Sequence, residues 1–297
     1  MGRRLSRTVP GLGVDLDDVT ANTLNEGAVI LGTELVRQVP SRGDIVLRLS
    51  CAPLRDARLG TKGATLVIDD LTERRKLEAE QERIRQTFGR VVAPRVRDRL
   101  LADPSNLRLD GTSQIVTVLF ADLSDFTAFS EKHAPETVFK TLNTYLSMAA
   151  NTILEEEGTL DKFMGDAVLA IWNSPDPQED HALRAVRAAL TTMRRLADCY
   201  KKFPDLEQQM GFRIGITTGP AMVGNVGTND LFNYTAIGDA VNLAQRLQAA
   251  AKPGQILLNK DTYDIVAGQV VATPLEPLIV KGRAQPAEVY ELKGLKG

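Results

Sequence analysis

Two aspartates stand where the ends of neighbouring strands would bring them together. Asp122 ends the apolar run 115–121, and Asp166 occupies a short turn within 163–167. Each aspartate alone is typical of a residue that caps backbone N–H groups. Two carboxylates at adjacent strand ends would instead form an oxygen-rich site, which suits Mg²⁺ or Mn²⁺ bound together with a phosphate chain.

An amide and a guanidinium share one face of a later predicted helix. Asn242 and Arg246 are spaced i, i+4 within the segment 239–250, and its apolar residues fall on the opposite side. The two polar groups could together bind an oxyanion. Taken by itself, the pattern is explained more simply as an ordinary surface helix.

The elements that must position these groups alternate along the chain from Ser113 onward. We predict strands at 115–120, 159–163, 167–172, 212–217, 221–226, 255–258, 278–280 and 289–292, and helices at 135–157, 180–200 and 239–250. This order is typical of an α+β fold with a ferredoxin-like βαββαβ core and added strands and helices, in which helices cover one face of one sheet. The glycine-rich stretch 219–227 is interpreted as a tight connection between strands, and it lacks the lysine of a P-loop.

Two further regions precede this part of the chain. Alternating apolar residues from Ile45 to Leu49 and the run 64–68 predict a β-hairpin with a longish loop. Because the segment 47–75 resembles the C-terminal half of a PAS sensor domain, residues 1–72 are interpreted as a partial PAS-like sensor segment.

Residues 73–112 are interpreted as a signalling helix and transducing linker. Leu77, Ile84 and Val91 recur every seven residues, and Phe88 occupies the complementary heptad position, which predicts a short parallel coiled coil. The arginines of this region form a basic run without interleaved aromatic residues. We therefore interpret them as a solvated helix face and expect no nucleic-acid partner.

Composition indicates an ordinary globular protein. The 297 residues carry a formal net charge of −2, which gives no overall attraction to nucleic acid or anionic lipid. Two cysteines, Cys51 and Cys199, imply no disulfide framework. No run approaches the ~20 apolar residues of a membrane span, so we expect no membrane contact by this chain and a cytoplasmic location.

Four motifs in this order resemble the catalytic domain of the class III adenylyl and guanylyl cyclases. They are FADLSDFT at 120–127, DKFMGDA at 161–167, YTAIGDAVNLAQRL at 234–247 and VKGR at 280–283. The resemblance spans about Ser113 to Leu292, and we take residues 113–297 as the catalytic domain. It is nearest to bacterial adenylate cyclases that carry threonine at a base-reading position.

The resemblance implies a role for each matching residue. Two Mg²⁺ or Mn²⁺ ions per active site would be held by Asp122, Asp166 and the Leu123 carbonyl. The terminal phosphates would be bound by Lys281 and by the backbone amides of Ser124, Asp125, Phe126 and Thr127. The purine edge would be read by Lys162 and Thr235, the ribose oriented by Asn242, and the charge that develops on the α-phosphate stabilised by Arg246.

The implied function is an adenylate cyclase that converts ATP into cyclic AMP and pyrophosphate at the interface of a head-to-tail homodimer. Lysine with threonine favours adenine, because the lysine donates to the purine and the hydroxyl accepts from the adenine amino group. Two departures stand out: Asp125 replaces a common glycine, and Thr235 replaces a common aspartate. The alternatives are a guanylate cyclase and a non-catalytic sensor or dimerisation module, and the regulatory input would be bicarbonate or an upstream sensor.

Overall fold

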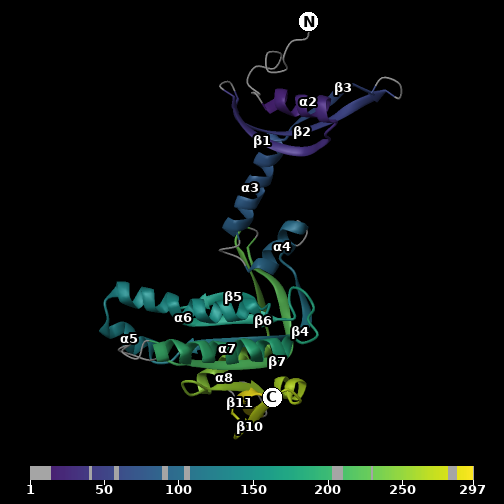
Figure 1. Ribbon diagram of the computed structural model, residues 1–297. Coiled ribbons are helices and arrows are strands. Elements are labelled where there is room, and N and C mark those ends of the chain that lie inside the picture. Colours follow the sequence, from purple (N-terminus) through teal and green to yellow (C-terminus); the bar gives the residue numbers. More distant parts are fainter. Residues whose placement is uncertain are drawn as a thin grey trace. The chain divides into compact units, whose positions relative to one another are not determined.

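The computed structural model describes residues 15–39, 42–56, 60–88, 93–103, 108–202, 210–228, 230–279 and 286–296. The chain divides into two compact units, Met1–Phe88 and Gly89–Gly297, and each is described by itself. Figure 1 labels the elements of both units. No helix within these described ranges is long and apolar enough to cross a membrane.

The first unit is a three-stranded antiparallel sheet with two helices. In chain order its elements are α2 (Asp15–Glu26), β1 (Ile30–Val39), β2 (Gly43–Asp56), β3 (Gly60–Asp70) and α3 (Thr72–Phe88). The predicted hairpin is confirmed as β2 and β3, and alternate β2 residues (Ile45, Leu47 and Leu49) are buried. The sequence analysis missed β1, which pairs with the outer edge of β2, and α2, which packs on β2 and β3.

The coiled coil of α3 stays a prediction. Leu77 is 61% exposed within its unit, as an unpaired heptad position would be. The side chains of Ile84 and Phe88, and the whole of Val91, lie outside the described residues.

The second unit contains one large sheet with the predicted βαββαβ core. In chain order its elements are α4 (Pro94–Ala102), β4 (Gly111–Leu123), α5 (Phe126–Lys132), α6 (Pro135–Glu155), β5 (Thr159–Met164), β6 (Ala167–Trp172), α7 (His181–Lys202), β7 (Phe212–Gly227), β8 (Phe232–Ile237), α8 (Asp239–Ala250), β9 (Ile256–Asn259), α9 (Lys260–Val266), β10 (Val270–Pro274) and β11 (Val289–Leu295). The strand order is β10-β11-β9-β7-β4-β6-β5, with β8 paired to β7. The core strands therefore lie in the order β7-β4-β6-β5, which confirms the ferredoxin-like fold class.

Helices cover both faces of this sheet, so the expectation of helices on one face was wrong. Leu119 and Ala121 of β4 share a buried cluster with residues of α6 and α7, whereas Val118 and Phe120 share another with Ala240 of α8. Figure 1 shows α6 and α7 side by side. β4 is continuously buried from 116 to 121, the pattern of a strand covered on both sides.

The glycine-rich stretch is part of a strand, which corrects the predicted connection at 219–227. β7 is one strand, and it pairs with β4 from Phe212 to Gly224. Its glycines permit close packing: a Cβ at Gly215 would lie 2.2 Å from the Ala244 carbonyl oxygen, and one at Gly224 would lie 2.0 Å from the Asp110 carbonyl oxygen. Of the predicted strand 278–280, Leu278 forms an isolated bridge to Ala287, and residue 280 lies outside the described ranges.

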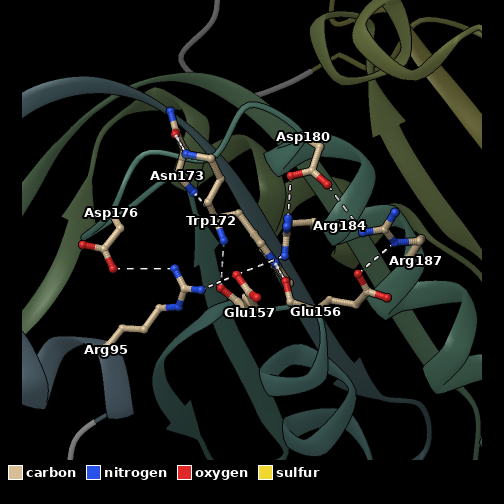
Figure 2. Close-up of polar contacts among 10 residues, drawn as sticks. Arg95, Glu156, Glu157, Trp172, Asn173, Asp176, Asp180, Arg184 and Arg187 are labelled. Carbon is tan, nitrogen blue, oxygen red and sulfur yellow. Dashed lines mark hydrogen bonds and ion pairs between the residues drawn. The ribbon is translucent and has the colours of Figure 1, made fainter.

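An ion-pair cluster fastens α4 to the rest of the second unit. Figure 2 shows the guanidinium of Arg95 between two carboxylates. It pairs with Glu157, which follows α6, and its Nη1 lies 3.6 Å from Asp176 Oδ2 in the loop after β6. α4 is thereby joined to the loops that follow α6 and β6.

Candidate active site

Asp122 and Asp166 meet at one end of the central strands. Asp122 lies in β4 opposite Ala167 of β6, and Asp166 lies in the turn directly before that residue. Burial raises the pKa of the Asp166 carboxyl, and the negative charge of Asp122 raises it further. The structure thus brings together the two carboxylates that the sequence analysis singled out.

Arg213 is a residue of this site that the sequence analysis missed. It is the register partner of Asp122 on β7, and its Nη2 pairs with Asp122 Oδ2. Gln248 of α8 donates to the same oxygen from Nε2 at 3.0 Å. The available signal was an arginine next to Phe212 and Ile214 in an otherwise apolar strand.

The two carboxylates fit divalent cations. Their negative charge is only partly balanced by Arg213, since the charge of Asp122 still raises the pKa of Asp166. A cation placed between the two oxygens would relieve this repulsion. The described residues hold no cluster of three or more His, Cys, Asp or Glu side chains suited to a metal ion. Further ligands to such a cation would be backbone carbonyls and water. The Leu123 carbonyl is the one that the sequence resemblance implies.

The loop after β4 offers fewer amides than predicted. The Ser124 N–H donates to the Gly211 carbonyl at 2.8 Å, and the Ser124 hydroxyl accepts from the Gly211 N–H at 2.9 Å. The Ser124 amide is therefore committed within the fold. The first intrahelical bond of α5 runs from the Phe129 N–H to the Asp125 carbonyl, so the N–H groups of Phe126 and Thr127 have no partner within the helix.

Lys162 and Thr235 come together around a third residue, Asp161. Thr235 lies in β8, where its hydroxyl donates to Asp161 Oδ2. The Lys162 Nζ lies 3.3 Å from Asp161 Oδ1. Burial raises the pKa of Asp161, whereas the Thr235 hydroxyl and the Lys162 charge act in the opposite direction. Asp161 was not among the residues predicted from the sequence to act in the site.

α8 has the predicted bounds and orientation. Asn242 is exposed and Arg246 half-buried, while Leu243, Ala244 and Leu247 are buried. Among the described residues, neither Asn242 nor Arg246 forms a hydrogen bond or ion pair with Asp122 or Asp166. The predicted phosphate ligand Lys281 lies outside the described residues.

Comparison with protein families identifies the second unit. Residues 110–294, more than half of the chain, match the family model of the adenylate and guanylate cyclase catalytic domain. This match includes the two aspartates of β4 and the β5–β6 turn.

Curated relatives agree with this match. The chain is 36% identical over 197 residues to Adenylate cyclase 1 of Rhizobium meliloti (strain 1021), covering 61% of this chain and 28% of that protein. It is 35% identical over 195 residues to the terminal-differentiation specific adenylate cyclase of Dictyostelium discoideum, covering 62% of this chain and 9% of that protein. An uncharacterised protein of Mycobacterium tuberculosis is 32% identical over 267 residues, covering 84% of this chain and 47% of that protein. The chain spans less than half the length of these relatives.

Solved structures of both nucleotide specificities resemble the second unit. The adenylyl cyclase CyaB from P. aeruginosa matches with a TM-score of 0.60 and 31% identity, covering 62% of this chain and 96% of that one. The guanylyl cyclase Cya2 matches with a TM-score of 0.60 and 32% identity, covering 63% and 96%.

Proposed function

This chain belongs to the adenylate and guanylate cyclase family, and on that premise we propose that it is an adenylate cyclase. It would convert ATP into 3′,5′-cyclic AMP and pyrophosphate in signal transduction. The observation that carries this proposal is the polar pair of Lys162 and Thr235 at Asp161. An ammonium that donates and a hydroxyl that accepts match the N1 atom and the amino group of adenine.

The chain's own carboxylates and amides would hold the phosphate end of the nucleotide. Asp122, Asp166 and the Leu123 carbonyl would bind two Mg²⁺ or Mn²⁺ ions, which when bound activate the ribose 3′-oxygen and neutralise the leaving pyrophosphate. The amides at the start of α5 and the side chain of Lys281 would bind the terminal phosphates.

Two residues of α8 would act nearer the reacting phosphorus. Asn242 would orient the ribose, so that the 3′-oxygen lies in line with the α-phosphorus. Arg246 would donate to the α-phosphate oxygens, where negative charge grows in the transition state. No side chain stands out as a general base.

The two halves of the site would come from two copies of the chain, arranged head to tail. Among the described residues of one copy, Asn242 and Arg246 form no hydrogen bond or ion pair with Asp122 or Asp166. This supports a site shared between two copies. Met222 of β7 is the register partner of Ile237 of β8, and both are exposed by about half. Phe163 and Met164 of β5 are also partly exposed. Such apolar side chains suit a protein interface. The first unit, which includes α3, would carry the input of an upstream sensor.

Product analysis tests the proposal. The purified chain, incubated with ATP or GTP and with Mg²⁺ or Mn²⁺, should form cyclic AMP faster than cyclic GMP. Faster formation of cyclic GMP would make it a guanylate cyclase. If neither product forms under any condition, the chain is a non-catalytic module and the proposal is wrong.

A further inference from the structure

Asp161 is a buried carboxylate at the residues proposed to read the base. The β5–β6 register slips between Leu160 and Lys162, so Asp161 is the extra residue of a bulge. Bulges redirect side chains, and here the Asp161 side chain is 0% exposed and its carboxylate contacts Thr235 on β8. A charged group in such surroundings needs compensating partners.

The contact with Asp161 fixes the direction of the Thr235 hydroxyl. A hydroxyl has one hydrogen and two lone pairs, whereas an ionised carboxylate only accepts. The Thr235 hydrogen is therefore committed to Asp161 Oδ2. Toward a ligand, the hydroxyl can present only lone pairs.

Lys162 supplies the complementary donor. Its Nζ lies 3.3 Å from Asp161 Oδ1, and its side chain is 36% exposed. Among the described residues, Oδ1 has no partner with good hydrogen-bond geometry. The positive charge of Lys162 stabilises the carboxylate, together with the Thr235 hydroxyl and the backbone N–H of Ala236. An ammonium carries three hydrogens, so Lys162 still has donors for a ligand.

We propose that Asp161 is a specificity-determining positioning residue: by taking the Thr235 hydrogen, it makes the site accept a hydrogen bond from the 6-position of a purine. Adenine has an amino group at this position, which donates. Guanine and hypoxanthine have a carbonyl there, which would face the lone pairs of Thr235 without a hydrogen between them. This inference rests on the proposed function, which assigns Lys162 and Thr235 to the base.

The substitution Asp161→Asn tests the inference because it reverses the direction of the Thr235 hydroxyl. The Lys162 ammonium attracts the amide oxygen of the new side chain, so the amide NH₂ faces Thr235 and donates to it. The Thr235 hydrogen then points toward the ligand. We would measure kcat/KM of the full chain for ATP and for inosine triphosphate, which has the 6-carbonyl but lacks the 2-amino group of guanine.

The unaltered chain should prefer ATP, and Asp161→Asn should shift the ATP-to-inosine-triphosphate ratio toward inosine triphosphate by about tenfold or more. Asp161→Ala frees the Thr235 hydroxyl to turn either way. The preference in kcat/KM for ATP over inosine triphosphate should therefore become smaller. This variant serves as the test if Asp161→Asn does not fold. In a Thr235→Val background, which has no hydroxyl, Asp161→Asn should leave the ratio unchanged.

Two outcomes separate this inference from the proposed function. If a folded Asp161 variant loses activity equally with both nucleotides, Asp161 is only structural and the inference is overturned, while the adenylate cyclase proposal stands. If the unaltered chain makes no cyclic AMP or prefers inosine triphosphate, the proposed function is wrong and the inference is wrong with it.

Discussion

Asp122 and Asp166 concentrate negative charge at one end of β4 and β6, with the Arg213 guanidinium beside them. This arrangement is unfavourable for folding but suitable for binding cations. We therefore expect the repulsion between these two carboxylates to lower the stability of the fold, while both carboxylates contribute to the proposed catalysis.

The substitution Asp166→Asn separates these two effects. It removes the repulsion with Asp122, so the melting temperature in the absence of metal should stay equal or rise. Cyclase activity should fall at least about a hundredfold, because one of the two proposed metal ligands is lost. Thermal denaturation and product formation, measured on the same preparation, check the predicted melting temperature and the predicted loss of activity. Near-full activity, or a clear loss of stability, would contradict the metal assignment.

Asp125 adopts a left-handed backbone conformation, with φ of 62°, and its side chain is exposed. This conformation is sterically unfavourable for residues that have a Cβ atom, whereas glycine adopts it without that cost. Asp125→Gly should therefore raise the free energy of unfolding by about 0.5–1 kcal/mol, measured by urea denaturation. Asp125→Ala is the matched control and should not be stabilising. Equal effects of the two substitutions would contradict this explanation.

Candidate site residues that lie in recognisable motifs were predicted from the sequence. Residues that reach the site only through strand register or a β-bulge were not. Asp122 and Asp166 lie in recognisable motifs at strand ends. Arg213 and Asp161 owe their positions to the β4–β7 register and to a bulge in β5. Neither the register nor the bulge can be read from a single strand's apolar pattern.

At the scale of elements, α8 was predicted with its correct bounds because its apolar and polar residues follow the helical period. β7 was divided wrongly, because glycine usually marks a turn. In β7, Gly215 and Gly224 instead allow other backbone segments to approach closely. That role depends on what packs against the strand, which the sequence of the strand does not state.

A row of hydroxyls joins α7 to β4, β7 and α9. The Thr262 hydroxyl donates to Asn259 Oδ1 at 2.6 Å, so Thr218 must donate to Thr262 and Thr117 to Thr218, at 2.9 and 2.8 Å. The Thr117 oxygen, 2.7 Å from His181 Nδ1, is then left to accept. The His181 ring therefore carries a hydrogen on Nδ1.

This row predicts a pH dependence of stability. Burial lowers the pKa of His181, so the unfolded chain takes up a proton more readily than the folded one. The contribution of neutral His181 to the free energy of unfolding is fully present above the ordinary histidine pKa of about 6.5. It is lost as the pH falls below that value. His181→Gln keeps an N–H donor but does not titrate. The decline in unfolding free energy from pH 7 to 5 should be smaller in this variant, and parallel curves would contradict the assignment.

At the scale of the whole molecule, each active site would be shared between two copies of the chain. One copy would supply Asp122 and Asp166, and the other would supply Asn242 and Arg246. A rotation between copies would then change the distance between the metal ions and the α-phosphate, and a misplacement of about 1 Å can cost on the order of a hundredfold in rate. The first unit could regulate the enzyme in this way without contacting the nucleotide.

Subunit complementation tests this shared site most directly. Asp122→Ala and Arg246→Ala chains should each be inactive alone as homodimers. In a mixed dimer, one site combines the intact carboxylates of the second chain with the intact Arg246 of the first. An equal mixture should therefore recover roughly a quarter of the unaltered activity if dimers form at random. Heterodimers that are shown to form but make no cyclic AMP would contradict the shared active site.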